Sequence, residues 1–437
     1  MSVEMKESGT LYAGQMPKTW KAVPIKFIAK CNTDSLSEGT DPSYEFRYVE
    51  IGSVSHENGI ESYENTLFKD APSRARRIVH RGDVIISTVR TYLKAVASIE
   101  DDDNVIVSTG FAVLTPVDID SKYFAYYLSS EPFVEEVSCN SYGLSYPAIN
   151  SSDLVRLKIC CPPIEEQRII AKYLDTECGK IDSAIQKHTE ATDKLLDLRL
   201  SIIINSTRKG VRRGHCPLKK TGNFWFPEIP ESWTLSRIGL CFDVTLGKML
   251  CTSPEDDTYT LEAYYCAGDV HFDGVTTEGN KQMWFSPSEK KTLSVRNGDV
   301  LVVEGGAGAG NTAIVQGQSK ETFIQNSILR LRPNKHGMSN EYVRYLLEGL
   351  VKLGYIEVAC NTATFTHFTK DKVRQVPIPI MPGDEQVEIA EYINGKCSKI
   401  EHIIKKHEDI VNALREYKKS LIYYAVTGKI DCTGTRN

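Results

Sequence analysis

The chain contains an internal repeat, and this repeat constrains its fold more than any other feature. Pro17-Lys18-Thr19-Trp20 returns in the second half as Pro230-Glu231-Ser232-Trp233. Arg81-Gly82-Asp83-Val84-Ile85 returns, at a slightly larger offset, as Asn297-Gly298-Asp299-Val300-Leu301. A long sequence period marks a repeated structural unit. The sequence therefore predicts two copies of one architecture, and the drifting offset predicts loops of unequal length.

A second part of the repeat keeps one constant offset, from Tyr173 and Tyr392 to Ser201 and Ser420. A long stretch without insertion or deletion is expected for a helix. Its seam positions are separated by alternating steps of four and three, which is typical of helices that pair in a coiled coil. At 1.5 Å per residue, about 28 residues give a rod of roughly 42 Å. The seam consists of Ile181, Ile185, His188, Thr192, Leu195, Arg199 and Ile202, and of Ile400, Ile404, His407, Val411, Leu414, Lys418 and Leu421.

A shorter helix is expected before each long one, led by a Pro-containing, acidic segment that suits a helix start. We expect Gly179 and Gly395 to separate the short helix from the long one. The seam histidines, His188 and His407, fit packing at the edge of the seam better than metal binding, because two histidines do not complete a zinc site.

The remaining parts, residues 20–160 and 233–380, carry short β-rich runs such as Asp83–Val89 and Asp299–Val303. Each also has one brief amphipathic helix, predicted over Lys122–Ser129 and Asn340–Leu347. These patterns predict two mixed α/β domains whose sheets are curved and mostly antiparallel.

The composition is that of a globular protein, with 41% hydrophobic and 25% charged residues. The 52 Lys and Arg residues against 57 Asp and Glu residues give a net charge of −5, which argues against a surface that coats polyanions but permits local basic patches. We expect a cytoplasmic protein with reduced thiols, because no apolar signal core or membrane span is evident and 12 cysteines are sparse for this length.

The sequence shows no recognisable catalytic motif. Residues 305–311 are rich in glycine but lack the Lys and Ser/Thr of a nucleotide-binding loop. This segment is open to three interpretations: a phosphate cradle, a hairpin that approaches another backbone such as DNA, or a plain turn. Asp101-Asp102-Asp103 fits a solvated turn better than a cation site, and Cys160-Cys161 lacks zinc-site spacing. We expect neither metal ligands nor catalytic residues, so binding is the preferred function.

Together these motifs resemble the specificity (S) subunit of type I restriction–modification enzymes. The motifs that carry the resemblance are Cys161–Gln167 followed by Lys180–Thr207, and Pro379–Gln386 followed by Lys399–Val426. The second copy departs from the pattern, because Pro382-Gly383-Asp384 stands where the first copy has the cleaner Pro163-Ile164-Glu165, while Asp384 and Glu385 keep the acidic helix start.

The resemblance implies an α/β (α+β) chain with an internal pseudo-two-fold repeat, in which two target-recognition domains are separated by two long antiparallel helices. The implied boundaries are 1–160 for the first recognition domain, 161–210 for a central helical spacer, 211–380 for the second domain and 381–437 for a C-terminal spacer. Each domain would read one half of a split, asymmetric site in double-stranded DNA. A rod of roughly 42 Å compares with about 34–36 Å for one DNA turn.

The resemblance also implies partners. Two methyltransferase (M) subunits, which bind S-adenosylmethionine and methylate adenine, would dock on the helices. Motor-endonuclease (R) subunits, which use ATP and magnesium, would join them. No cofactor is expected in this chain. The expected docking and coiled-coil positions are Glu166, Gln167, Ile181, Ile185, Leu195, Ile202, Glu385, Gln386, Ile400, Ile404, Leu414 and Leu421.

DNA contacts require cationic, amide, hydroxyl or aromatic side chains on loops. Segments 90–94 and 141–146 satisfy this in the first domain, and the glycine loop and segment 361–367 in the second. An arginine-rich run at 74–81 adds phosphate-binding candidates, and a basic run at 208–220 is either a further one or a solvated linker. The candidate DNA-binding residues are Arg74, Arg76, Arg77, Arg90, Tyr92, Lys94, Ser141, Tyr142, Ser145, Tyr146, Gly308, Asn311, Thr362, Thr364, Thr366 and His367.

Two alternatives to a DNA-specificity subunit are an interaction scaffold that does not read DNA and a fused enzyme with its own methylation chemistry. The second is disfavoured, because Cys161-Pro162-Pro163-Ile164 meets neither end of an Asp/Asn-Pro-Pro-aromatic loop.

Overall fold

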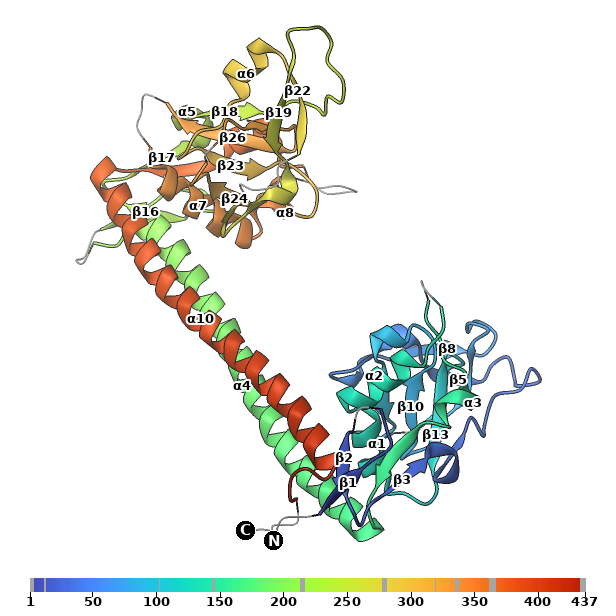
Figure 1. Ribbon diagram of the computed structural model, residues 1–437. Coiled ribbons are helices and arrows are strands. Elements are labelled where there is room, and N and C mark those ends of the chain that lie inside the picture. The colour runs from blue at the N-terminus through green and yellow to red at the C-terminus, as the bar shows by residue number, and fades with distance from the viewer. Residues whose placement is uncertain are drawn as a thin grey trace. The chain divides into compact units, whose positions relative to one another are not determined.

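The computed structural model describes residues 4–11, 13–101, 103–143, 146–212, 217–276, 281–318, 320–334, 338–360 and 367–432. The chain divides into two compact units, residues 1–189 with 408–437 and residues 190–407. Helices α4 (Ile164–Lys209) and α10 (Gly383–Val426) each contribute one part to the first unit and one part to the second (Figure 1). Each unit is thus a globular domain completed by segments of both long helices. No helix in the described part of the chain is long and apolar enough to cross a membrane.

The first unit holds two four-stranded sheets. One is antiparallel, with the strand order β11 (Val96–Ser98), β10 (Val84–Ser87), β13 (Phe111–Pro116) and β4 (Ala29–Cys31). The other has the order β8 (Glu64–Leu67), β5 (Glu45–Val49), β12 (Val105–Ser108) and β9 (Ala75–Ile78), in which only β5 and β12 pair in parallel.

The second unit repeats this arrangement. Its antiparallel sheet has the order β18 (Phe242–Leu246), β26 (Ile328–Pro333), β23 (Val300–Val303) and β24 (Thr312–Ile314). A three-stranded sheet has the order β22 (Gln282–Phe285), β19 (Thr260–Tyr265) and β25 (Phe323–Ile324), in which β19 and β25 pair in parallel. The predicted mixed domains with mostly antiparallel sheets are confirmed.

Shorter elements complete both units. The two-stranded pairs are β1 (Met5–Glu7) with β2 (Gln15–Pro17), β3 (Lys21–Pro24) with β14 (Lys158–Cys161), β6 (Val54–Ser55) with β7 (Gly59–Ile60), β15 (Leu218–Lys220) with β16 (Glu228–Pro230), β17 (Thr234–Arg237) with β27 (Pro377–Ile380), and β20 (Val270–His271) with β21 (Gly274–Val275). The shorter α-helices are α1 (Ser121–Leu128), α2 (Glu131–Cys139), α3 (Ser151–Leu154), α5 (Ile238–Cys241), α6 (Pro287–Leu293), α7 (Asn340–Lys352), α8 (Tyr355–Ala359) and α9 (Lys370–Gln375).

The repeated Gly-Asp-Val segment is a turn that starts the central strand of each antiparallel sheet. The Asp83 carboxylate accepts a hydrogen bond of 2.8 Å from the backbone N–H of His80, and Asp299 accepts one of 2.9 Å from Arg296. The preceding glycines have φ angles of 88° and 93°, which favour glycine over other residues. This motif therefore has a structural role in both units.

Helices α4 and α10 continue through Gly179 and Gly395, so the predicted break between a short and a long helix is wrong. A glycine inside a helix costs only about 1 kcal/mol relative to alanine. This cost is offset by the burial of apolar residues on both sides of each glycine. These residues are Cys178 and Ile181 in α4 and Cys397 and Ile400 in α10.

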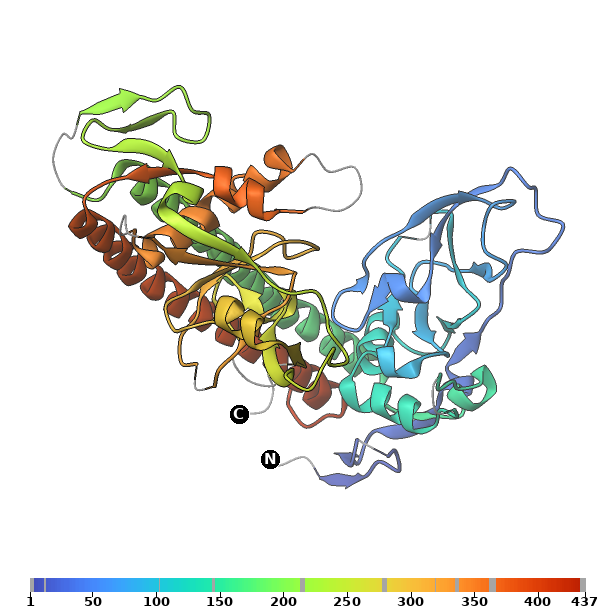
Figure 2. The same ribbon diagram turned by 90° about the horizontal axis from the view of Figure 1, so that it is seen from above.

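The two long helices pack antiparallel within each unit, side by side in both views (Figure 1, Figure 2). In the first unit Lys418 Nζ lies 2.7 Å from Asp182 Oδ1, and in the second Arg199 Nε lies 3.1 Å from Glu401 Oε1. The constant offset of the helical repeat carries Asp182 onto Glu401 and Arg199 onto Lys418, so the two ion pairs are equivalent. Every predicted seam position is buried or half-buried. The predicted antiparallel helix pair is confirmed.

Each globular domain holds the far end of the helix that returns to it. The hydroxyl of Tyr123 in α1 donates a 3.0 Å hydrogen bond to the carbonyl of Val426, and the hydroxyl of Tyr342 in α7 donates one of 2.9 Å to Thr207. Both tyrosines are fully buried. The first domain is therefore completed by the C-terminal helix, and the second by the central helix.

Candidate nucleic-acid interface

In the first unit, two loops predicted to contact DNA lie side by side. We call the described residues 88–94, 141–143 and 146–149 the first recognition loops. Val89 and Ala148 form a β-bridge, and the N–H of Ile149 donates a 2.9 Å hydrogen bond to the carbonyl of Thr88. Thr91 Oγ1 also donates to Ser141 Oγ at 2.8 Å. The structure thus brings together two segments that are far apart in the sequence.

The second unit joins its loops in the same way. We call the described residues 304–311 and 367–368 the second recognition loops. Gly305 and His367 form a bridge, and the N–H of Phe368 donates a 2.6 Å hydrogen bond to Glu304. The offset of the Gly-Asp-Val motif carries Val89 onto Gly305, and the offset of the long helices carries Ala148 onto His367, so the two bridges correspond. Ser145, Thr362, Thr364 and Thr366 lie outside the described residues.

The first recognition loops expose a cluster of aromatic side chains beside an arginine. Tyr92, Tyr142 and Tyr146 are 54%, 74% and 66% exposed. The Arg90 guanidinium lies 5.2 Å from the ring centroid of Tyr146. Arginine and exposed rings are the groups that stack on bases and contact their edges. This surface is therefore suited to contact with nucleic acid.

The backbone of this loop is also strained. Arg90 and Lys94 have φ angles of 51° and 52° and flank the short helix η3 (Thr91–Leu93). Non-glycine residues in this region cost free energy, of order 1 kcal/mol each, and they cluster at functional sites. The bonds to the partner loop hold η3 in this conformation.

Lys94 and Ser141 have structural contacts. Lys94 forms ion pairs with Glu131 and Glu135 of α2, so its charge is already neutralised. Ser141 Oγ donates a 2.8 Å hydrogen bond to the carbonyl of Val137. Both residues fix the loop position, while Arg90, Tyr92, Tyr142 and Tyr146 present its surface.

Three arginines of the basic run, Arg74, Arg76 and Arg77, have different surroundings. Arg74 is exposed, and its carbonyl accepts a 2.8 Å hydrogen bond from the N–H of Thr109. The next residue, Gly110, accepts a hydrogen bond from the N–H of Thr88 in the first recognition loops, so Arg74 lies close to them. The Arg76 guanidinium stacks 4.7 Å from the ring centroid of Phe68. Arg77 is half-buried, and its Nε is buried without a hydrogen-bond partner. Arg74 is thus the member best placed to contact phosphate beside the loops.

The glycine loop joins the antiparallel strands β23 and β24 as a hairpin. A phosphate cradle of the nucleotide-binding type leads into a helix, so this interpretation is wrong. Gly310 has a φ of 86°, and a Cβ there would lie 2.9 Å from Val351 Cγ2, so only glycine fits. His367, which is bridged to Gly305 from the other segment, is exposed, and its Nδ1 lies 3.1 Å from Glu304 Oε2. Gly308 and Asn311 are half-buried within the same loop.

The Glu-Gln motif at the start of each long helix fastens the helix to its domain. Gln167 Oε1 accepts a 2.8 Å hydrogen bond from the N–H of Asp120, which caps α1, and Gln386 accepts one of 2.7 Å from Ser339, which caps α7. Glu166 accepts a 3.1 Å hydrogen bond from Trp20 Nε1. Both glutamines are buried, so their contacts lie inside the chain. Tyr123 and Tyr342 also join each domain to a long helix. They were not selected from the sequence, although the offset of the helical repeat carries one onto the other.

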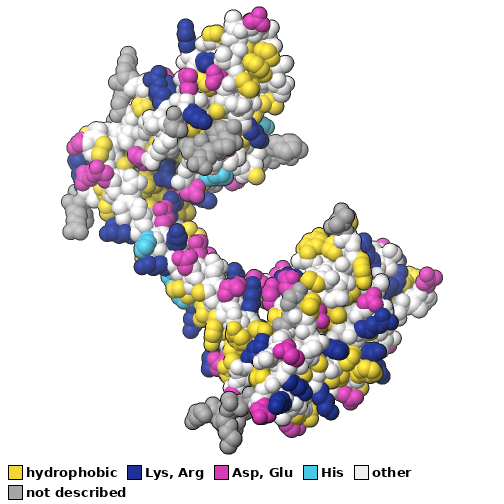
Figure 3. Space-filling model, viewed as in Figure 1, with side chains coloured by type: hydrophobic (Ala, Val, Ile, Leu, Met, Phe, Trp, Pro, Cys, Tyr) yellow, Lys and Arg dark blue, Asp and Glu magenta, His cyan; other side chains and the backbone are white. Residues whose placement is uncertain are grey.

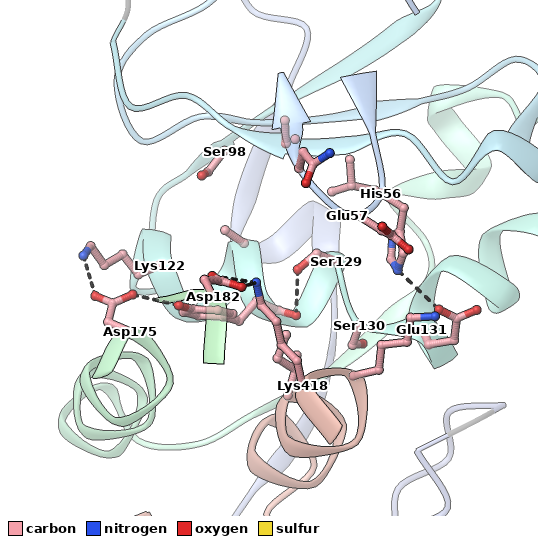
Figure 4. A pocket seen from close by; sticks show the side chains of 18 of the residues that line it. His56, Glu57, Ser98, Lys122, Ser129, Ser130, Glu131, Asp175, Asp182 and Lys418 are labelled. Carbon is pink, nitrogen blue, oxygen red and sulfur yellow. Dashed lines mark hydrogen bonds and ion pairs between the residues drawn. The ribbon is translucent and has the colours of Figure 1, made fainter. Parts of the chain in front are cut away.

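A cavity of about 400 Å³ lies in the first unit, where the globular domain meets α4 and α10 (Figure 4). His56 Nε2 lies 3.3 Å from Glu131 Oε2 on one side, and Asp175 Oδ2 lies 2.5 Å from Lys122 Nζ on the other. Asp182 of α4 and Lys418 of α10, which form an ion pair, also line the cavity. The equivalent place in the second unit is also hollow and is lined by Glu341, Tyr345, Asn394 and Glu401. In that unit Arg199 pairs with Glu348, and Ser129 takes the position of Glu348 in the first unit.

The buried His56 gives a prediction for the first unit. Desolvation lowers the pKa of His56, although Glu131 opposes this, so the folded protein favours the neutral ring. The contribution of the neutral His56 ring to the free energy of unfolding is fully present above the unfolded-state pKa of about 6.5. This contribution is lost as the pH falls through the lower folded-state pKa. We expect urea unfolding at pH 5.5 and 7.5 to show a smaller acid-induced loss in His56→Gln than in the unchanged chain. Equal losses in both proteins would contradict this.

Basic and acidic side chains are interspersed on the face shown in Figure 3. Among the described residues, no group of three or more His, Cys, Asp or Glu side chains could hold a metal ion. The candidate site therefore consists of two loop pairs of equal construction and unequal composition. Because a duplicated scaffold presents two different loop surfaces, the chain has the features of a binding protein with two separate recognition domains.

Comparison with known proteins identifies the family. The model for the type I restriction modification DNA specificity domain matches twice, over residues 17–191 and 230–410. The chain belongs to this family and contains two copies of its domain. The resemblance to this family seen in the sequence is confirmed.

Among curated proteins, the chain is similar to the putative type I restriction enzyme MjaX specificity subunit of Methanocaldococcus jannaschii, with 28% identity over 66% of this chain and 63% of that protein. The MjaVIII specificity subunit of the same organism is 23% identical over 44% of this chain and 42% of its own length. The chain thus matches less than two thirds of the length of these relatives.

Two solved structures share the fold. One, from work on complex assembly and conformational transition of the type I R-M system, has a TM-score of 0.74 and 23% identity over 95% of this chain and 99% of that one. The other, the HsdS subunit from Thermoanaerobacter tengcongensis, has a TM-score of 0.51 and 23% identity over 95% and 98% of the two chains.

Proposed function

We propose that this specificity subunit recognises a bipartite, asymmetric site in double-stranded DNA and directs adenine methylation and restriction by partner subunits. The observation that carries the proposal is the repeated construction of the recognition loops. In each unit one loop follows the central strand of the antiparallel sheet and is bridged to the loop before the last short helix. Each loop pair would read one half-site.

The unequal composition of the loops supports an asymmetric site. The first pair presents Arg90 with three exposed tyrosines, and the second presents a glycine hairpin with His367. Different side chains make different contacts with base edges. The two half-sites should therefore differ in sequence.

The chemistry is assigned to the partners. Two methyltransferase subunits would supply S-adenosylmethionine-dependent methylation, and motor-endonuclease subunits would use ATP and magnesium. The chain itself acts as a recognition subunit without catalytic residues. Its location would be the cytoplasm, where these partners and the DNA are found.

Binding of the chain with its methyltransferase partner to a pool of randomised duplexes tests this function. At moderate salt, selection should enrich one split motif with two different halves, because specific contacts exceed the electrostatic background under these conditions. Enrichment of no motif would identify the chain as an interaction scaffold and contradict the proposal.

The arginines of the first domain give a second prediction. Arg90→Ala should weaken specific DNA binding by about 1–3 kcal/mol, and Arg74→Ala should weaken binding to all duplexes and reduce the salt slope by about 1. Lys26→Ala, which alters an exposed cation stacked on Phe27, serves as the matched control. Thermal unfolding should be unchanged in all three variants. If both arginine variants keep the original affinity and salt slope, the placement of the interface is wrong.

A further inference from the structure

One hairpin is built twice in this chain, outside the recognition loops. Strands β1 and β2 pair with Met5 opposite Pro17, and strands β15 and β16 pair with Leu218 opposite Pro230. The offset that carries Pro17 onto Pro230 also carries Met5 onto Leu218, so the two hairpins are equivalent position by position.

The hydrogen bonds of the two hairpins correspond bond by bond. Lys6 Nζ donates to the carbonyl of Lys18 at 2.8 Å, and Lys219 Nζ donates to Glu231 at 2.7 Å. Inside the turn, the N–H of Thr10 donates to Ser8 Oγ at 3.2 Å, as the N–H of Asn223 donates to Thr221 Oγ1 at 3.0 Å. These bonds shape the two turns in a similar way, although Gly14 has a φ of 63° where the second turn has Pro227.

Both turns point a large apolar side chain into solvent. Leu11 is 63% exposed and its counterpart Phe224 is 80% exposed, whereas the next core positions, Ala13 and Phe226, are buried. The Phe224 ring is supported by Trp225, at 5.0 Å between centroids, which in turn contacts Tyr355. The internal fold does not require these two exposed side chains, since neither is buried by the chain.

Each hairpin is also fixed to the ends of the long helices in its unit. Trp20, which follows β2, donates to Glu166 at the start of α4. The ring of Trp233, which follows β16, packs against Gly210 just after α4, so closely that a Cβ atom added to this glycine would lie 3.3 Å from the ring. The hairpins are therefore rigid extensions of the helical part of each unit.

The contrast between hairpins and recognition loops indicates what binds them. Surfaces that meet two different DNA half-sites must differ, and the recognition loops do. Surfaces that meet two copies of one protein must agree, and the hairpins agree in strand register, in the hydrogen bonds above and in an exposed apolar side chain at the tip. Burial of a Leu or Phe side chain in a partner removes a large apolar surface from water, which suits an anchor residue in a protein interface.

We propose that the tips of the two hairpins, at Leu11 and Phe224, each insert into the same apolar pocket on one of two methyltransferase subunits. This inference rests on the proposed function, because it takes the two-copy partner to be the methyltransferase. Leu11 anchors one copy to the first unit, and Phe224 anchors the second copy to the second unit.

Native mass spectrometry of the full chain with its methyltransferase partner tests the proposal. The unchanged chain should bind two copies. Leu11→Asp and Phe224→Asp should each weaken one binding step at least tenfold, and the double variant should weaken both. Val117→Asp and Leu250→Asp, which alter exposed apolar residues elsewhere in the two units, should keep both steps. Leu11→Ser and Phe224→Ser provide uncharged versions if an aspartate variant fails to fold.

A residue exchange separates docking from folding. Leu11→Phe with Phe224→Leu should retain two bound copies, because both tips enter the same pocket. Two copies bound by the double aspartate variant with unchanged affinity would overturn the docking proposal alone. A chain that binds the partner but selects no DNA motif would overturn the proposed function instead. Dimerisation of the isolated chain that is lost in the aspartate variants would show that the tips bind a second copy of this chain, and would also overturn the docking proposal.

Discussion

A chain shortened to end at His407 is expected to lose the cooperative fold of its first unit. The removed helix segment supplies Leu421, Ala425 and Val426 to the core of that unit, where they are 6%, 0% and 0% exposed. It also supplies the carbonyl that accepts the hydrogen bond from Tyr123. Loss of one buried leucine costs about 2–5 kcal/mol, and the whole stability of a domain is about 5–15 kcal/mol.

Hydrogen–deuterium exchange measures this loss in each unit separately. Peptides from α1 should exchange rapidly in the shortened chain, while peptides from β23 in the second unit should keep their protection. A chain ending at Cys432 retains the helix and should match the full chain. Undiminished protection of α1 in the chain ending at His407 would show that the first domain does not depend on the returning helix.

Glu348→Gln is expected to destabilise the second unit by about 1–3 kcal/mol, because Arg199 loses one of its two carboxylate partners. Glu348 is 2% exposed and pairs with Arg199, which is 16% exposed, so the substitution leaves a buried guanidinium without its nearest carboxylate. The pair of Arg199 with Glu401 remains, at 3.1 Å, on the more exposed side. Tryptophan fluorescence in a urea titration reports this unit well, because Trp225, Trp233 and Trp284 lie in it.

The equivalent position of the first unit provides the matched control. Lys418→Met removes the counterpart of Arg199, but the pair it breaks is 26% and 54% exposed, so the cost should be below about 1 kcal/mol. Arg199→Met with Glu348→Leu should recover most of the loss, since an apolar pair can replace a buried ion pair. Equal effects of Glu348→Gln and Lys418→Met would contradict the burial argument.

The repeat made most of the fold predictable. The constant offset and the seam from Ile181 to Ile202 determine a long helix and its buried side, because helical periodicity follows directly from spacing. The break at Gly179 was not correctly predicted, because the packing of Cys178 and Ile181 is a tertiary effect. The sheet pairing, including the parallel contact of β5 with β12, depends on strands that are distant in sequence, so it could not be predicted either.

The candidate site was predictable only at the level of segments. Residue type and loop position selected both loop pairs, and their repeat positions indicated that they are equivalent. The roles within a loop depend on neighbours far away in sequence. Lys94 is neutralised by two glutamates of α2, and Gln167 is buried against the cap of α1, although both appeared to be contact residues from the sequence.

The net charge of −5 is compatible with this account. A subunit that meets DNA through two short loop pairs, with partners around the duplex, needs local cations such as Arg74 and Arg90. Its remaining surface can stay mixed in charge, as the face in Figure 3 is.

Methylome sequencing of a host that expresses the chain with its methyltransferase partner tests the proposed split recognition site most directly. We expect one adenine-methylated motif made of two different half-sites separated by a spacer of fixed length. Exchange of residues 233–380 for the equivalent domain of another specificity subunit should replace one half-site and keep the other. Absence of a split motif, or a motif that is unchanged when this chain is omitted, would contradict the account.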